Sequence, residues 1–145
     1  MAKLKEIVSY FEELVPPEMK VDNDNVGLLV GTNETEVTKV IVALDITSGV
    51  IDEAINANAQ LILSHHPMFF ELKQVNDNSP AGKKIVKMLQ HGISGFCQHT
   101  NLDCVSGGVN DALADKLGVA VEGFLDGPHF TKDGQEYGMG RFGYL

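Results

Sequence analysis

The chain has 145 residues, of which 43% are hydrophobic and 21% charged, and its formal net charge at pH 7 is -9. The length is typical of one domain and the composition is that of a globular protein, which excludes a chain that is disordered throughout. The excess of acidic residues disfavours direct contact with the phosphate backbone of nucleic acids.

Two further classes of protein are excluded by local patterns. Residues 1–14 carry charge throughout and lack the uninterrupted apolar stretch of a secretory signal. No run approaches the roughly 20 apolar residues that span a bilayer. The two cysteines, Cys97 and Cys104, are too few for a disulfide framework and fit a reducing compartment. We therefore expect a cytoplasmic protein that makes no membrane contact.

The first part of the chain alternates between helical and extended patterns. Apolar residues at helical spacing predict a helix over residues 3–14, which ends at a Pro-Pro pair. A short apolar run between glycines predicts a strand at 26–31. The continuous β-branched run KVIVALD at 39–45 is typical of a strand that is covered on both faces. A Thr-Ser pair can cap the helix that we predict over 47–57.

The same alternation continues through the centre of the chain. QLILS predicts a buried strand at 60–64, and residues 68–78 are predicted as a loop, with a short strand as the alternative. A serine cap followed by proline predicts a helix at 80–91 that stops at a glycine. A third strand is predicted at 93–98. A further helix is predicted at 109–117, again closed by a glycine.

Strands that alternate with helices predict βαβ units. We therefore expect an α/β fold with a mostly parallel central sheet flanked by helices, and we assign residues 1–145 to this one domain. The glycine-rich tail after about residue 123 has a weaker pattern. Its last residues, 138–145, are predicted as a final strand or as the beginning of a longer element.

Polar side chains follow three of the predicted strands. Asp45 ends the first, His65 and His66 follow the second, and the segment from His99 to Asp103 follows the third. Because the carboxyl ends of parallel strands meet at one edge of a sheet, we expect these side chains to converge.

Imidazole and carboxylate are common ligands of divalent transition metals. Adjacent residues on a regular strand point to opposite faces, but this alternation relaxes at a strand end. His65 and His66 can therefore each meet a different ion in one cleft, and metals about 3.5 to 4 Å apart are a standard arrangement for activating water. We predict His65, His66 and Asp103 as metal ligands. Asp45 is predicted to accept a hydrogen bond behind them or to cap the following helix.

Other candidates have simpler explanations. His91 lies near a helix C-terminus, where a cation is favourable, so we predict a structural role for it. His129 lies in the unassigned tail. Cys104 is a possible soft ligand, but no other thiol-rich segment lies near it in the sequence. Gly107 and Gly108 precede a helix and could bind an anion such as a phosphate, although a tight turn explains them equally well.

Five motifs occur in order along nearly the whole chain and together resemble the Nif-three-like family, whose bacterial members are often described as type 2 homologues of GTP cyclohydrolase I. They are DNVGLLVG (24–31), SHHPMFF (64–70), HTNLD (99–103), GGVNDALADKLG (107–118) and GMGRFGYL (138–145).

This resemblance implies the α/β fold of that family and a centre of two divalent transition metal ions, such as zinc, iron or manganese. It implies that His65 binds one ion, that His66 and Asp103 bind the other, and that His99 lies close behind the ligands. It also implies a homohexameric ring whose metal sites face an internal cavity.

The sequence departs from the family pattern in two places. Family members are usually longer, and their remaining ligands, a His and a bridging Glu, come from a C-terminal motif that these residues do not contain. We therefore expect the 145 residues to correspond to the N-terminal portion of the family fold. The sequence also has Asn23-Asp24-Asn25 where the family often has Trp-Asp-Asn.

Three functions are consistent with these observations. The first is metal-dependent hydrolysis of a small, nucleotide-like substrate, for which the sequence assigns no catalytic residue. The second is a metal carrier or sensor that uses the same ligands without catalysis. The third, suggested by the family name alone, is an interaction scaffold.

Overall fold

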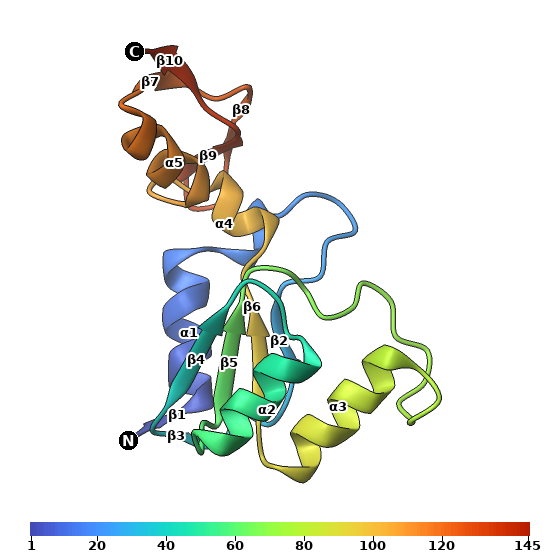
Figure 1. The fold of residues 1–145 in the computed structure, drawn as a ribbon. Helices are drawn as coiled ribbons and strands as arrows, with labels where there is room; N and C mark the ends of the chain where they lie inside the picture. Colours follow the sequence, from blue (N-terminus) through green and yellow to red (C-terminus); the bar gives the residue numbers. More distant parts are fainter. The chain divides into compact units, whose positions relative to one another are not determined.

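The computed structural model describes residues 1–145 and divides them into two compact units (Figure 1). The first unit contains residues 1–14 and 23–99, and the second contains residues 15–22 and 100–145. The sequence pattern did not indicate this division. None of the helices is both long enough and apolar enough to cross a bilayer.

A four-stranded sheet forms the centre of the first unit (Figure 1). Its strands, in spatial order, are β2 (Gly27–Val30), β6 (Ser94–Cys97), β5 (Leu61–Ser64) and β4 (Val40–Ala43). The pairs β4–β5 and β5–β6 are parallel, whereas β2 runs antiparallel to β6. The predicted α/β fold with a mostly parallel sheet is therefore confirmed.

Three helices of the first unit match the predicted ones within one residue at each end. They are α1 (Leu4–Leu14), α2 (Ser48–Asn56) and α3 (Pro80–Gln90). Of the two candidate caps for α2, the structure uses Thr47, whose hydroxyl accepts a hydrogen bond from an amide in the first turn. Ser79 caps α3 in the same way, and proline follows at the first helical position.

The two faces of this sheet are covered by different helices. On one face, buried residues of α2 and α3 pack against alternate strand residues such as Ile62. On the other face α1 packs against Leu61, Leu63 and Phe96. Because successive residues of a strand point to opposite faces, the apolar run of β5 supplies both cores. A short antiparallel pair joins β1 (Ala2–Lys3), which directly precedes α1, to β3 (Glu36–Val37).

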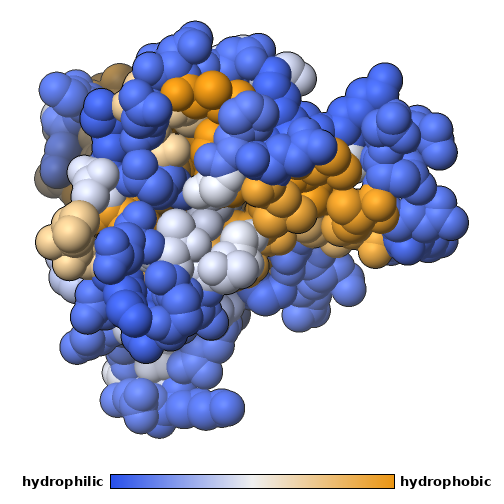
Figure 2. Space-filling view, turned by 90° about the horizontal axis from the view of Figure 1, so that it is seen from below, coloured by the Kyte–Doolittle hydropathy of each residue, from blue (hydrophilic) through white to orange (hydrophobic).

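The segment between β5 and α3 contains no strand, so residues 68–78 form the predicted loop and not the alternative short strand. Large apolar side chains remain exposed in the first unit. They include Val42 at 75%, Phe70 at 61% and Leu44 at 60% relative exposure. The face drawn in Figure 2 likewise shows hydrophobic surface between hydrophilic side chains.

The second unit is built from short elements. They are η1 (Pro17–Met19), α4 (Thr100–Cys104), α5 (Val109–Leu117), β7 (Ala120–Gly123), β8 (Asp126–Phe130), β9 (Glu136–Met139) and β10 (Phe142–Tyr144). The strands form two antiparallel pairs, β7 with β10 and β8 with β9. Helix α5 and a strand near the end of the tail were predicted, whereas α4 and the other three strands were not.

A buried arginine organises the second unit. The side chain of Arg141 is 5% exposed, and its Nε and Nη2 donate to Asp111 over 2.5 and 3.0 Å. Its guanidinium also donates to the Val105 carbonyl and lies 4.4 Å from the centre of the Phe124 ring. These hydrogen bonds hold the pKa of the Asp111 carboxyl below its ordinary value, and the Gly107 amide contributes to the same shift.

Candidate metal centre

The ends of two neighbouring parallel strands carry three histidines. His65 and His66 directly follow β5, and His99 follows β6 by two residues. Ser64 and Cys97, the last residues of these strands, are register partners, so both strands end at the same level. The predicted convergence at the carboxyl edge of the sheet therefore holds for the three imidazoles.

The three imidazoles form a compact triangle. Their ring centres are 5.1 Å apart for His65 and His66, 5.3 Å for His65 and His99, and 5.7 Å for His66 and His99. One nitrogen from each ring lies within 4.8 Å of one nitrogen from each of the others. This spacing allows the three rings to share a metal ion.

The adjacent histidines are held by different acceptors. The Nδ1 of His65 is 3.0 Å from the Gln98 carbonyl oxygen, and the Nδ1 of His66 is 2.8 Å from Asp45 Oδ1. A carbonyl or carboxylate oxygen can only accept a hydrogen bond, so the Nδ1 of each histidine carries the hydrogen. In the neutral ring the lone pair then belongs to Nε2, which is the atom that can bind a metal.

His99 is held in the same way by a residue far away in the sequence. Its Nδ1 donates to Asp24 Oδ1 over 2.9 Å, and the Asp24 side chain is only 2% exposed. Asp24 in turn accepts from the amide of Asn25, whose side chain donates to the Phe69 carbonyl. Three imidazoles with the same tautomer thus fit a divalent transition metal, because acceptors behind metal-binding histidines characteristically fix the ring and its tautomer.

Buried groups at the strand ends also fix the backbone of the two adjacent histidines. The Cys97 thiol donates to the His65 carbonyl over 3.1 Å, and the Ser64 hydroxyl donates to the His66 carbonyl over 2.9 Å. Burial raises the pKa of the Cys97 thiol to about 12. The Cys97 thiol is therefore a neutral hydrogen-bond donor to the backbone at this strand end.

The residues that were predicted from the sequence as part of the site have different surroundings in the structure. Asp45 accepts from His66, which agrees with one of its two predicted roles. His99 lies in the cluster with His65 and His66, and its Nδ1 donates to Asp24, which sequence reasoning did not assign; the predicted place of His99 behind the ligands stays a prediction. Asp103 belongs to the second unit and lies on α4, so its role as a ligand stays a prediction.

The two glycines before α5 form a turn. Gly107 has a φ of 77°, and its amide donates to the Asp111 carboxylate over 2.6 Å. A Cβ on Gly108 would lie 2.0 Å from the Leu102 carbonyl oxygen. The turn thus explains both glycines, and anion binding at Gly107 and Gly108 stays a prediction.

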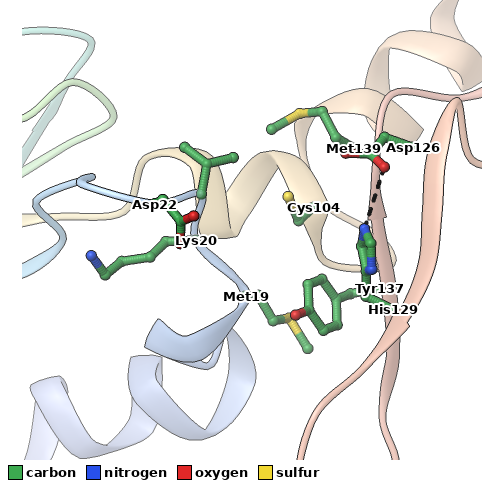
Figure 3. Close-up of a pocket in the computed structure, with 9 residues that line it drawn as sticks. Met19, Lys20, Asp22, Cys104, Asp126, His129, Tyr137 and Met139 are labelled. Carbon is green, nitrogen blue, oxygen red and sulfur yellow. Dashed lines mark ion pairs between the residues drawn. The ribbon is translucent and has the colours of Figure 1, made fainter.

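The remaining histidines have other surroundings. His91 donates from Nδ1 to the Lys87 carbonyl at the end of α3, consistent with a structural role. In the second unit, His129 pairs with Asp126 over 3.4 Å beside a cavity of about 340 Å³ (Figure 3). The buried Cys104 lines this cavity, and burial raises the pKa of its thiol.

Comparison with known proteins agrees with this fold. Residues 2–145 match the family described as Duf34/NIF3 (NGG1p interacting factor 3). The chain belongs to this family. A GTP cyclohydrolase 1 type 2 homolog from Clostridium acetobutylicum is 39% identical over 140 residues, which are 96% of this chain and 52% of the relative. A Bacillus subtilis protein of the same description is 43% identical over 114 residues, which are 78% of this chain and 31% of the relative.

Solved structures show the same fold. The Bacillus cereus protein related to NIF3 superposes with a TM-score of 0.81 at 38% identity, over 90% of this chain and 36% of that chain. Reduced HcgD from Methanocaldococcus jannaschii superposes with a TM-score of 0.77 at 31% identity, over 83% of this chain and 49% of that chain. The chain thus spans about half or less of the length of these relatives.

Proposed function

We propose that His65, His66 and His99 bind a divalent transition metal through Nε2 and that the metal serves hydrolysis of a small substrate. The observation that carries this proposal is the shared hydrogen-bonding of the three rings, each with Nδ1 held by an oxygen acceptor. Zinc, iron and manganese all accept imidazole ligands. Three protein ligands with one open position are typical of catalytic zinc sites, whereas structural sites are closed by four.

The protein groups around the imidazoles have defined roles in this proposal. A bound metal supplies Lewis acidity and lowers the pKa of water at the site. Asp24 and Asp45 keep the rings in the tautomer that binds metal, and their negative charges make the imidazoles better donors. His66 is 43% exposed on its side chain, which leaves the cluster open to solvent and substrate.

An exposed aromatic ring beside the cluster supports a nucleotide-like substrate. The Phe70 ring centre lies 6.2 Å from that of His99, and Phe70 is 61% exposed. A nucleobase can stack on such a ring whatever its hydrogen-bonding pattern. The name of the C. acetobutylicum relative points to the same class of compound. We also retain Asp103 as a proposed ligand of a second ion.

Metal binding by the imidazoles is tested by titrating the purified chain with zinc and manganese against a competing chelator. We expect His65→Ala, His66→Ala and His99→Ala each to lower the affinity at least about tenfold, because each removes one donor. His91→Ala is the matched control, since His91 is bonded within α3. Unchanged affinity in all three cluster variants would contradict the proposed site.

Hydrolysis is tested with a panel of nucleotides and phosphoesters on the metal-loaded protein. We expect Phe70→Ala to raise KM for the nucleotide substrates without changing the metal content, because Phe70 is proposed to contact the base and not the metal. Turnover that is equal with and without metal would rule out the proposed role of the metal. Absence of turnover across the panel would argue against hydrolysis.

Metal transfer without catalysis is the second candidate function. The observation that favours it is the exposure of the His66 and Asp45 side chains, 43% and 52%. An acceptor molecule can reach a metal ion that is bound by an exposed side chain and take the ion over. Transfer of zinc to a chelator in solution, followed over time, separates the two functions. Transfer within seconds favours a carrier, whereas retention for hours favours a resident cofactor.

A further inference from the structure

A cleft of about 770 Å³ lies between the loop after β5 and the beginning of α3. All of its lining residues belong to the first unit. In Figure 1 this loop leaves the carboxyl edge of the sheet at the end of β5 and runs to α3. We call this cavity the loop cleft. Its lining residues include Met68, Glu71, Lys73, Ser79 and Lys84.

Two lysines give the loop cleft a local positive charge in an acidic protein. Lys73 and Lys84 line it together with a single acidic residue, Glu71. The whole chain carries a formal net charge of -9, so a cleft with more cations than carboxylates runs against the overall field. The other polar side chains in the lining are uncharged amides and a hydroxyl. A local excess of positive charge of this kind attracts anionic ligands.

Lys84 is held in the loop cleft without a carboxylate partner. Its Nζ donates to the Ile46 carbonyl over 2.9 Å, and the residue is partly buried. Lys3 and Lys87 of the same unit form ion pairs with carboxylates, whereas Lys84 forms none. Burial lowers the pKa of the Lys84 ammonium, and the Asp45 carboxylate opposes this shift without cancelling it. An ammonium carries three N–H donors, so donors remain for a ligand after the bond to the Ile46 carbonyl.

The loop cleft adjoins the histidine cluster. The carbonyl that accepts from Lys84 belongs to Ile46, the residue that directly follows Asp45. Asp45 in turn accepts from the His66 ring. On the other side, Met68 lines the cleft two residues after His66 in the chain. A substrate whose reacting group lies at the imidazoles can therefore place another group in the loop cleft.

We propose that the loop cleft binds the phosphate group of the substrate, with the Lys84 ammonium as the main contact and Lys73 as the second. Phosphate oxygens accept charge-assisted hydrogen bonds from ammonium groups, and their negative charge offsets the hydration that Lys84 loses on burial. This inference rests on the proposed function for the identity of the substrate. Phosphate binding itself is measured without metal or turnover, so the two proposals can fail separately.

The test measures binding of guanosine monophosphate (GMP) and of guanosine to the 145-residue chain in the presence of a chelator, so that no metal contributes to phosphate binding. We expect GMP to bind at least about tenfold more tightly than guanosine, a usual effect of hydrogen bonds to charged groups. Lys84→Gln should remove most of this preference and leave guanosine binding unchanged. Lys83→Gln is the matched control, because Lys83 is exposed, adjacent and outside the lining.

A purely structural role of Lys84 gives a different result. Its bond to the Ile46 carbonyl joins α3 to the segment before α2, so Lys84→Gln can also lower the Tm. A structural effect would weaken binding of GMP and guanosine alike, whereas loss of a phosphate contact weakens binding of GMP alone. Lys84→Arg should restore the preference for GMP, because the guanidinium keeps the positive charge.

Substitutions in the exposed loop keep the test open if Lys84→Gln does not fold. Lys73→Gln should weaken GMP binding by about two- to fivefold, the usual range for an exposed charge pair. Glu71→Gln should strengthen GMP binding by a similar factor, because it removes a repelling charge from the same cleft. Unchanged binding of GMP in both loop variants would contradict the proposal.

The remaining outcomes separate the phosphate site from hydrolysis. Equal affinity for GMP and guanosine, or equal effects of Lys84→Gln and Lys83→Gln on GMP, would overturn the phosphate site. Tighter binding of inorganic phosphate than of GMP would indicate a site for the free anion and would contradict its assignment to a substrate. A Lys84-dependent preference for GMP in a metal-loaded protein that hydrolyses no nucleotide would support the phosphate site and count against hydrolysis.

Discussion

At the scale of single residues, the site depends on which ring nitrogen of each histidine carries the hydrogen. Asp24 illustrates this, because its buried carboxylate lies 75 residues away from His99 in the chain and yet fixes its tautomer. Without that acceptor, the His99 ring could rotate or carry its hydrogen on Nε2, and either change would remove a donor from the cluster.

We therefore predict that Asp24→Asn weakens zinc binding by about 10- to 100-fold, the usual effect of removing an acceptor behind a metal-binding histidine. Competition with a chelator measures the change. Asp77→Asn, in the exposed loop of the same unit, is the control and should bind zinc like the unsubstituted chain. Equal affinity of the two variants would show that the charge of Asp24 is not needed.

The convergence of His65, His66 and His99 could be expected from the sequence, whereas the place of His99 within the cluster and its support by Asp24 could not. His65 and His66 directly follow an apolar strand and precede Pro67, which is a local signal. The position of His99 relative to them depends on the β5–β6 register, and the role of Asp24 depends on a contact between distant segments. No local periodicity carries that information.

At the scale of elements, the predictions succeeded where capping and apolar periodicity coincide. Helix α3 has both, with Ser79, a leading proline and a closing glycine. Helix α4 was missed because its five residues are too few to show a period. The short strands of the tail were missed because each depends on a partner strand more than on its own apolar pattern.

The turn between α4 and α5 allows a test at this scale. Gly108→Ala should destabilise the second unit by about 1 to 3 kcal/mol, because the new Cβ meets the Leu102 carbonyl in a backbone that cannot easily move. Gly49→Ala, in the open first turn of α2, should be neutral or stabilise by up to about 1 kcal/mol. Urea unfolding of both variants measures the difference, and equal stability would contradict the steric account.

At the scale of the whole molecule, the sequence pattern did not indicate the two compact units, and the assignment of residues 1–145 to one domain stays a prediction. The segment 15–22 belongs to the second unit although residues on both sides of it belong to the first. Such an exchange of segments follows from tertiary packing and leaves no change in composition. The second unit has a small apolar core, so its stability relies more on polar contacts such as the one between Arg141 and Asp111.

We predict that Asp111→Asn lowers the stability of the second unit at pH 7 by about 1 to 2 kcal/mol, a modest cost because the Asp111 side chain is 24% exposed and partly solvated. The pKa of Asp111 is lowered in the folded state. Its contribution is therefore present above the ordinary pKa of an aspartate and is lost as the pH falls through the lowered value.

Unfolding measured as a function of pH tests this sign. The difference in the free energy of unfolding between the unsubstituted chain and Asp111→Asn should be constant near neutrality and should disappear in acid. Asp115→Asn, on the exposed side of α5, is the control, because Asp115 makes no contact with Arg141 that the substitution would remove. A difference in stability that increased in acid would contradict a lowered pKa of Asp111 in the folded state.

The order of strands in the first unit has a consequence for the spacing of the three imidazoles. The three imidazoles leave β5 and β6, which are the two interior strands of the four. Fraying begins at edges and chain ends, so it does not separate these strands from one another. Fraying of the outer strands therefore leaves the strands that carry the three imidazoles paired, and we expect the spacing of the triad to persist through such local opening.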